Sequence, residues 1–325
     1  MGRLFSIGEV LIDFIPLQKG KALKDVHSFK REPGGAPANV AAAVAKYGAE
    51  SAMITKLGMD AFSDFLIEEL QKVGVKTDKI KRTTEAHAGL AFVSLREDGE
   101  RDFSFYRNPS ADLLLSEDEI EASWFAKGDI LHFCSVDLVE SPMKKAHEKA
   151  IQLVKENGGL ISFDPNVRLP LWNSAEECRQ TIAAFIPKAH LIKISDEELT
   201  FITGITNEQQ AIEQLFTGDV KAVICTKGAK GAALYTKHAT YESTGFNVEV
   251  QDTTGAGDAF IGGFLYKLLE KGGNEENLLD ILHEHHHEIL TFANASGALT
   301  TTGQGAISAL PSKEEILRFI KTYEK

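Results

Sequence analysis

The chain contains the stretch Asp252-Thr253-Thr254-Gly255-Ala256-Gly257-Asp258-Ala259-Phe260, which joins a glycine turn and an aspartate to an apolar helix. Gly255 and Gly257 let the backbone turn so that several N–H groups point one way, and the helix N-terminus adds partial positive charge. Such a loop can bind an anion beside the Asp258 carboxylate. This combination suits phosphoryl transfer, in which charge develops on the phosphoryl oxygens while an alcohol loses its proton. The segment alone is equally compatible with a structural glycine loop capped by an aspartate.

A second glycine motif lies more than two hundred residues earlier, where Gly34-Gly35-Ala36-Pro37-Ala38-Asn39 opens an alanine-rich helix. Together the two segments resemble the two hallmark motifs of the ribokinase-like sugar kinases, the phosphofructokinase-B type. The early motif belongs to the sugar side of that family and the late motif to the phosphate side. The resemblance extends over essentially the whole chain, and within Phe105–Leu115 and Asp164–Arg168 the sequence is most similar to fructokinases.

The length of 325 residues allows one large α/β domain or two ordinary ones. From about residue 130 onward, apolar runs alternate with helical patterns, which predicts β-α-β units and a mostly parallel sheet with helices on both faces. Single strands are predicted over Arg3–Phe14 and over Val248–Asp252, just before the glycine loop. The family resemblance implies a ribokinase-like three-layer α/β sandwich forming one domain over residues 1–325.

Two inserted segments, about residues 15–32 and 89–107, do not follow the alternation of strands and helices. Alternating residues on either side of Asp98-Gly99 predict a hairpin with its turn at that dipeptide. The resemblance implies that both segments form a small β-sheet lid over the sugar.

The overall composition is that of an ordinary soluble protein, with 43% hydrophobic and 25% charged residues. Three cysteines, Cys134, Cys178 and Cys225, lie in apolar or helical contexts without a CxxC pair, which predicts a reduced, cytoplasmic setting. The net charge of −12 argues against a nucleic-acid surface. No apolar run reaches the length of a membrane span, and strand-like sequence from Arg3 leaves no room for a signal peptide.

Asp258 is the predicted catalytic base, since an ordinary carboxylate can accept a proton that leaves late in phosphoryl transfer. Gly255, Ala256 and Gly257 are predicted to supply the N–H groups that bind the migrating phosphoryl group. The alternative for Asp258 is a helix-terminal aspartate favoured by the helix dipole. The loop is neither a Walker P-loop nor a dinucleotide fingerprint, because Phe260 stands where the latter has its third glycine.

The resemblance places a sugar site at Asp13, Gly35 and Asn39, although Asn39 could instead cap the alanine-rich helix. Carboxylate and amide groups suit adjacent hydroxyls, and a glycine allows close approach of the backbone. Asn166 lies in the fructokinase-like motif and is expected to join them. Arg107 and Arg168 could bind sugar or phosphate oxygens, or could be solvated surface charges. Related keto-deoxy-gluconate kinases use arginines in this region for a carboxylated sugar, so an acidic substrate stays open.

The resemblance also implies a nucleotide site. Its residues are Glu198, Thr226, Lys227, Gly228 and Asn294. Family members often carry Asn-x-x-Glu where this chain has Ser195-Asp196-Glu197-Glu198, a pattern that equally fits a helix capping box. Glu198 is expected to act through waters of the Mg²⁺ that accompanies ATP, because Mg²⁺ usually keeps several waters.

Two further sets of residues suggest metal-binding sites. Asp252, Thr254 and Gly305 could line a monovalent-cation site of the kind found in several relatives, with K⁺ as the candidate ion. Residues 283–287 read His-Glu-His-His-His, but only His283 and His287 have the i, i+4 spacing and no third ligand is evident. A solvated polar helix face is therefore the favoured interpretation of this histidine cluster.

The sequence as a whole predicts an ATP-dependent sugar kinase, with fructokinase, which converts D-fructose and ATP to fructose 6-phosphate and ADP, as the first hypothesis. Ribokinase and keto-deoxy-gluconate kinase are the alternatives within the same class. A sugar-sensing protein without turnover is the alternative of another class, although such a sensor need not retain Asp258. The oligomeric state is open, with a homodimer among the options.

Overall fold

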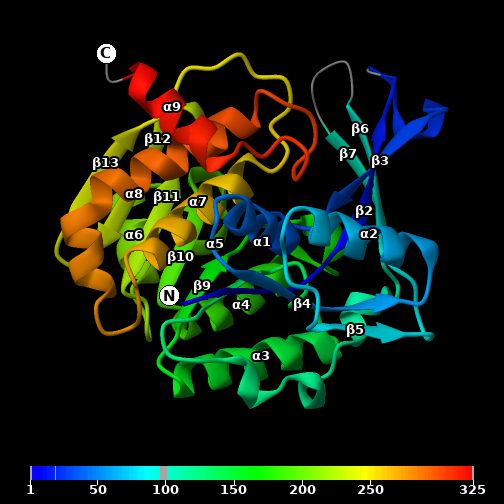
Figure 1. Cartoon of the computed structure of the whole chain (residues 1–325), viewed down its shortest axis with the longest axis horizontal. Helices are drawn as coiled ribbons and strands as arrows, with labels where there is room; N and C mark the ends of the chain where they lie inside the picture. Colours follow the sequence, from blue (N-terminus) through cyan, green and yellow to red (C-terminus); the bar gives the residue numbers. More distant parts are fainter. Residues whose placement is uncertain (1, 19, 96–100, 324–325) are drawn as a thin grey trace.

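The computed structural model describes residues 2–18, 20–95 and 101–323 and contains two β-sheets with helices around the larger one (Figure 1). The strands of the large sheet lie in the order β13 (Thr240–Thr244), β12 (Gly231–Thr236), β11 (Ala222–Thr226), β10 (Leu191–Ser195), β9 (Leu160–Asp164), β8 (Ile130–Cys134), β1 (Leu4–Ile7), β4 (Ser51–Gly58) and β5 (Ile80–Thr83). Neighbouring strands from β5 to β11 pair in parallel, whereas β12 and β13 add an antiparallel edge. The predicted mostly parallel sheet is confirmed.

Helices cover both faces of the large sheet, which produces the three predicted layers. One face packs against α1 (Ala36–Lys46), α2 (Ala61–Lys72), α7 (Ala256–Glu270), α8 (Leu278–Thr300) and α9 (Lys313–Tyr323). The other face packs against α3 (Pro142–Glu156), α4 (Ala175–Phe185), α5 (Asp196–Thr203) and α6 (Glu208–Leu215). Each face therefore has its own buried hydrophobic cluster, and the sheet separates the two.

The small sheet stands at one side of the molecule and contains β3 (Phe29–Gly34), β2 (Leu11–Pro16), β6 (Gly89–Leu95) and β7 (Arg101–Tyr106), in that order (Figure 1). β2 pairs in parallel with β6, and the other two pairings are antiparallel. Both segments that departed from the strand–helix alternation thus contribute to one sheet. The predicted turn at Asp98-Gly99 lies outside the described residues.

The single strand predicted over Arg3–Phe14 is wrong, because the chain changes sheets within it. β1 ends at Ile7 in the large sheet, and β2 begins at Leu11 in the small one. Gly8 has a φ of 146°, and a Cβ there would lie 2.6 Å from Cγ of Pro37 at the start of α1. A bend against α1 therefore replaces a continuous strand.

The strand predicted over Val248–Asp252 is also wrong. The last strand of the sheet is β13, and residues 245–250 have no regular structure. The N–H groups of Gln251 and Asp252 instead donate to the carbonyl of Thr301, at 2.8 and 3.2 Å. The segment before the glycine loop is therefore held by the end of α8 rather than by a neighbouring strand.

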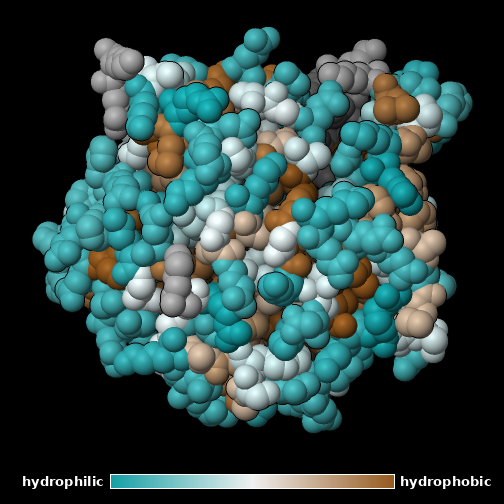
Figure 2. Space-filling view, in the orientation of Figure 1, coloured by the Kyte–Doolittle hydropathy of each residue, from teal (hydrophilic) through white to brown (hydrophobic). Residues whose placement is uncertain are grey.

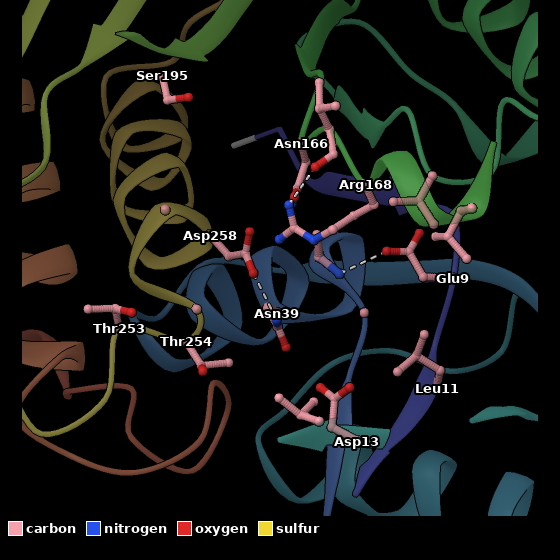
Figure 3. Close-up of a pocket in the computed structure, with 18 of the residues that line it drawn as sticks. Glu9, Leu11, Asp13, Asn39, Asn166, Arg168, Ser195, Thr253, Thr254 and Asp258 are labelled. Carbon is pink, nitrogen blue, oxygen red and sulfur yellow. Dashed lines mark hydrogen bonds between the residues drawn. The ribbon is translucent and has the colours of Figure 1, made fainter. Parts of the chain in front are cut away.

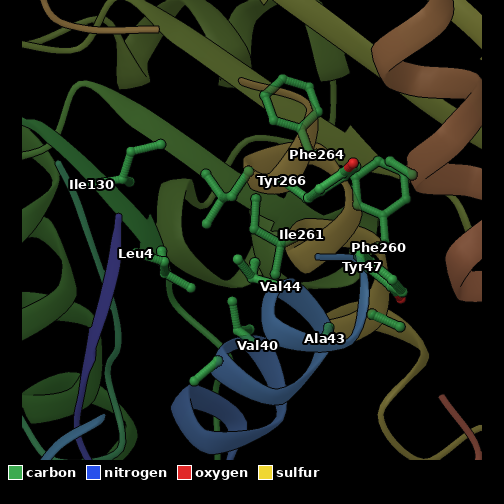
Figure 4. Close-up of a cluster of buried hydrophobic side chains, with 14 of the residues drawn as sticks. Leu4, Val40, Ala43, Val44, Tyr47, Ile130, Phe260, Ile261, Phe264 and Tyr266 are labelled. Carbon is green, nitrogen blue, oxygen red and sulfur yellow. The ribbon is translucent and has the colours of Figure 1, made fainter. Parts of the chain in front are cut away.

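The alanine-rich sequence of α1 is explained by its close contact with α7 (Figure 4). A Cβ on Gly262 of α7 would lie only 2.6 Å from Cβ of Ala43, and residues 41–43 of α1 are fully buried alanines. Small residues on both helices let the two backbones approach closely. This contact brings the beginnings of α1 and α7, and the two glycine motifs, into the same region.

The face shown in Figure 2 is covered mainly by hydrophilic residues, with hydrophobic ones in separate small groups. Within the part of the chain that the structure describes, no helix combines the length and apolar character needed to cross a bilayer.

Replacing Gly262 by Ala should destabilise the fold, because the added methyl group would collide with Ala43. We expect the free energy of unfolding, measured by urea denaturation, to fall by about 1–3 kcal/mol despite the better helix propensity of alanine. Glu284→Ala, on the exposed side of α8, is the control and should change it by less than about 0.5 kcal/mol. An unchanged or increased stability of Gly262→Ala would contradict the close helix contact.

Candidate active site

A cavity of about 390 Å³ lies where the carboxyl ends of the central strands meet the small sheet. Ligands of open α/β sheets bind at this end of the strands. Its wall combines side chains of β2, the start of α1, the ends of β9 and β10, the start of α5 and the glycine loop (Figure 3). Both sequence motifs, more than two hundred residues apart, therefore line one cavity.

The glycine loop ends in the first turn of α7. Gly255 is the N-cap of this helix and has a left-handed backbone with a φ of 76°. Gly255 and Gly257 line the cavity, and α7 begins between them at Ala256. The Ala256 N–H donates to the Thr253 carbonyl at 3.3 Å, so this group closes the turn instead of pointing freely into the cavity. The first turn of a helix leaves N–H groups and a positive dipole end available, as an anion site requires.

Asp258 lies in the first turn of α7 and is joined to the other motif by a hydrogen bond. The Asn39 amide donates from Nδ2 to Oδ2 of Asp258 at 2.8 Å (Figure 3). Burial raises the pKa of Asp258, while the Asn39 hydrogen bond and the positive charges of Lys193 and Arg168 lower it. Asn39 therefore lies within α1, and its side chain is a hydrogen-bond partner of Asp258. The alternative that it caps the helix is wrong, since Gly35 occupies the N-cap.

Lys193 is a cavity residue that the sequence reasoning missed. It lies on β10, is 7% exposed, and forms an ion pair with Asp164 of β9 at 2.8 Å. Burial disfavours its charge, but Asp164 and the nearby carboxylates outweigh this effect and raise the pKa of Lys193. A Cβ on Gly257 would lie 3.2 Å from Nζ of Lys193, so a fixed ammonium group lies beside the glycine loop. A lysine in the apolar run Leu191–Ser195 is the signal that could have revealed it.

The small-sheet side of the cavity is acidic. Asp13 extends from β2, and burial raises its pKa to about 7, with Arg168 opposing this shift. Glu9, also missed from the sequence, is 3% exposed and accepts a hydrogen bond from the Ala36 N–H at 3.0 Å. Its Oε2 has no hydrogen-bond partner among the described residues. Gly35 has a φ of 108°, and a Cβ there would lie 2.4 Å from the Glu9 carbonyl oxygen.

The two arginines of the predicted sugar site behave differently. Arg168 lines the cavity, as does the neighbouring Asn166. Arg107 does not line it: the guanidinium is buried and pairs with the carboxylates of Asp112 and Asp137. The expected contact of Arg107 with sugar or phosphate oxygens is therefore replaced by an internal ion cluster, because two buried acids satisfy its charge.

The residues assigned to the nucleotide divide into two groups. Glu198 lines the cavity and also completes the capping box, accepting hydrogen bonds from Ser195 N at 3.0 Å and Oγ at 2.9 Å. Its other oxygen accepts from the Val167 N–H at 2.7 Å. The remaining residues lie outside the cavity wall: Thr226, Lys227, Gly228 and Asn294. Of these, Lys227 pairs with Glu208 and Asn294 donates to Oγ of Ser243 at 2.9 Å.

The three residues of the candidate K⁺ site are brought together. Asp252 Oδ1 accepts hydrogen bonds from N and Oγ1 of Thr254, at 2.9 and 2.7 Å. Its Oδ2 accepts from the Gly305 N–H at 3.1 Å. These oxygen-bearing residues fit a hard monovalent cation in their chemistry, beside the anion loop.

The histidine cluster lies on α8, where His283 and His287 are exposed, and it keeps its surface interpretation. His283 contacts the Tyr241 hydroxyl through Nδ1 at 2.8 Å, and His286 stacks on the Tyr241 ring at 4.0 Å. Within the residues described, no group of three His, Cys, Asp or Glu side chains suited to a metal ion is found.

Comparisons with known proteins show which family the chain resembles over its length. The sequence model of the "pfkB family carbohydrate kinase" matches residues 1–313. Probable fructokinase-4 of Arabidopsis thaliana is 43% identical over 98% of this chain and 96% of the relative. Among solved structures, fructokinase of Xylella fastidiosa with bound ATP has a TM-score of 0.89 and 36% identity, covering 99% of both chains. A Vibrio cholerae fructokinase double mutant bound to fructose, ADP and potassium has a TM-score of 0.86, 35% identity and 98% coverage of both chains.

The Asn39–Asp258 hydrogen bond leads to a prediction about the ionisation of the Asp258 carboxyl group. Removing the amide in Asn39→Ala should raise the pKa of Asp258 further, because the ionised carboxylate loses a donor. The neutral form would then persist to higher pH. Carboxyl ¹³C NMR titration of the two proteins measures this shift.

The matched control is Asn294→Ala, which removes an amide bound to Ser243 and should leave the titration of Asp258 unaltered. An unchanged or lower pKa of Asp258 in Asn39→Ala would show that the hydrogen bond does not stabilise the ionised form.

Proposed function

Because the chain belongs to the pfkB family of carbohydrate kinases, we propose that it transfers the γ-phosphoryl group of ATP to D-fructose, forming fructose 6-phosphate and ADP. The observation that supports this most directly is the Asn39–Asp258 hydrogen bond. It joins the motif on the sugar side to the motif on the phosphate side, so a hydroxyl held by Asn39 lies close to the carboxylate. Relatives that resemble the chain over nearly its full length are named fructokinases.

In the proposed mechanism Asp258 is the catalytic base. It accepts the proton of the attacking hydroxyl as the bond to phosphorus forms, while Asn39 and Asp13 orient the sugar. N–H groups of the glycine loop and the ammonium of Lys193 stabilise the charge that develops on the transferred group. The Lys193–Asp164 pair keeps this ammonium fixed in a buried position, so little reorganisation is needed during the reaction.

The charge of the sugar side favours a neutral substrate. Glu9 and Asp13 line this part of the cavity, and Arg107 is taken up by Asp112 and Asp137. A carboxylated sugar would meet these acids without the Arg107 charge to balance them. Among the described arginines, only Arg168 lines the cavity and can offset the charge of these acids. We therefore propose keto-deoxy-gluconate as a poorer substrate than fructose.

The nucleotide is proposed to extend outward from the glycine loop toward Thr226, Lys227, Gly228 and Asn294. Mg²⁺ would accompany its phosphates and neutralise part of their charge, with Glu198 holding metal-bound waters. K⁺ would be held by Asp252, Thr254 and Gly305 and would stabilise the loop that binds the phosphoryl group. We place the enzyme in the cytoplasm as a monomer or homodimer.

Substrate specificity is tested by a coupled ADP-release screen over fructose, ribose, keto-deoxy-gluconate, adenosine and glucose. Fructose should give the highest kcat/KM. A tenfold preference for ribose or an acidic sugar, equivalent to about 1.4 kcal/mol in transition-state binding, would show that the fructokinase assignment is wrong. The absence of any sugar-stimulated turnover would favour a sugar sensor.

Asp258→Asn separates chemistry from binding. The carboxylate acts on a proton that leaves only in the transition state, so kcat should fall by about 10²-fold or more while dissociation constants for fructose and ATP change severalfold. In the parent enzyme, kcat should also decrease as the pH falls through the raised pKa of Asp258, since the protonated base is inactive. Steady-state turnover measures kcat and its pH dependence, and calorimetry measures the two dissociation constants. Near-normal kcat would exclude Asp258 as the base, and lost ATP binding would make it a structural residue.

The small sheet is proposed to close over the sugar and exclude water that would hydrolyse ATP. Hydrogen exchange in residues 15–32 and 89–107 should therefore slow at saturating fructose. The helix α3, on the other side of the large sheet, serves as the internal control and should exchange unchanged. Identical exchange of both segments with and without fructose would argue against a lid.

A further inference from the structure

The loop that follows α8 contacts both the small sheet and the segment that carries the glycine loop. We call residues 303–308 the bridging loop. On one side the Ser308 hydroxyl, which donates to the Gln304 carbonyl within the loop at 3.0 Å, also lies 3.3 Å from Oε2 of Glu32, in β3 of the small sheet. On the other side the Gly305 N–H donates to Asp252, which also holds Thr254 next to Gly255. One short loop thus connects the small sheet to the glycine loop.

Packing makes the connection to the glycine loop stiff. A Cβ on Gly255 would lie 2.6 Å from Cβ of Ala306, so the bridging loop and the N-cap of α7 are in direct contact. Ala306 and Ile307 are each 4% exposed. Displacement of the bridging loop therefore has to displace Gly255 or open a gap beside it.

The bridging loop is connected to the sugar side of the cavity through the pairing of β3 with β2. Glu32 lies directly opposite Asp13 in the β2–β3 register. Its side chain is 12% exposed and also pairs with Lys30 of the same strand. A movement of β2 that accompanies contact between sugar and Asp13 is therefore shared by Glu32. Figure 3 shows Asp13 and Thr254, the two ends of this connection, on facing sides of the cavity.

We infer that Glu32 is a positioning residue that couples sugar binding at Asp13 to the order of the phosphoryl-binding loop, through Ser308 and the bridging loop. The inference rests on the proposed kinase function and adds to it a route of communication. When bound sugar moves the small sheet toward the cavity, the Glu32 carboxylate comes closer to the Ser308 hydroxyl. The bridging loop then holds Gly255 and Asp252 in the arrangement that binds phosphate. By reciprocity, a bound nucleotide strengthens sugar binding by the same factor.

Calorimetry with a non-hydrolysable ATP analogue, titrated with and without saturating fructose, measures this coupling as a ratio of two dissociation constants. The full chain is used at pH 8, above the pKa of about 7 of Asp13, because Glu32 is one of the charges that raise that pKa. We expect tighter nucleotide binding with fructose in the parent protein. In Glu32→Gln the ratio should fall at least threefold and kcat by three- to tenfold, while fructose binding alone changes less than twofold.

Ser308 provides the second half of the test. Ser308→Ala should reduce the ratio as Glu32→Gln does, and the double variant should lose no more than Ser308→Ala alone, because both act on one contact: the first removes the hydroxyl and the second the charge of its acceptor. Ser308→Thr keeps the hydroxyl and should keep the coupling, which a merely structural effect would not predict. Asp25→Asn, a matched carboxylate change at an exposed position before β3, is the control and should leave the ratio and kcat unchanged.

The outcomes distinguish this inference from the function on which it rests. Coupling that survives in Glu32→Gln, or variants whose losses simply add, would overturn the role of Glu32 while leaving the kinase intact. An active parent enzyme without any coupling would overturn it as well. A parent protein that binds no fructose would refute the proposed substrate first, and the inference with it.

Discussion

The close contact between α1 and α7 is the constraint on which the site depends. Ala43 and Gly262 leave so little space between the two helices that their beginnings are held in a fixed relation. Asn39 and Asp258, one from each helix, then meet at 2.8 Å. A larger residue at the contact would separate them, and a shift of about 1 Å in reacting groups can cost orders of magnitude in rate. The packing of α1 against α7 therefore also sets the geometry of the Asn39–Asp258 pair.

The charges of the cavity are arranged in two parts. Glu9 and Asp13 give the sugar side an acidic wall, whereas the ammonium of Lys193 lies beside the glycine loop. Burial opposes ionisation at each of these sites, and specific partners decide the result. Asp164 keeps Lys193 charged, whereas Arg168 only partly offsets burial at Asp13, whose pKa is raised to about 7. The arrangement suits a neutral polyol on one side and an anionic phosphoryl group on the other.

The small sheet belongs to the site as much as the large one does. Its strand β2 supplies Asp13, and the chain reaches it through the bend at Gly8. The end of β7 leads to Arg107, which is anchored in the main body by Asp112 and Asp137. The sheet is thus attached at its base by a bend and a buried ion cluster.

The sequence by itself determined the alternating architecture and the two glycine motifs, because periodicity and turn residues act over a few positions. It also pointed to Asp258, Asn39 and Asp13. Only the tertiary structure decided that Lys193 and Glu9 line the cavity and that Arg107 does not. It likewise decided that the chain changes sheets at Gly8 and that Asp252 is held by Thr301. These outcomes depend on which distant groups meet after helices and sheets pack, and local patterns carry no information about that.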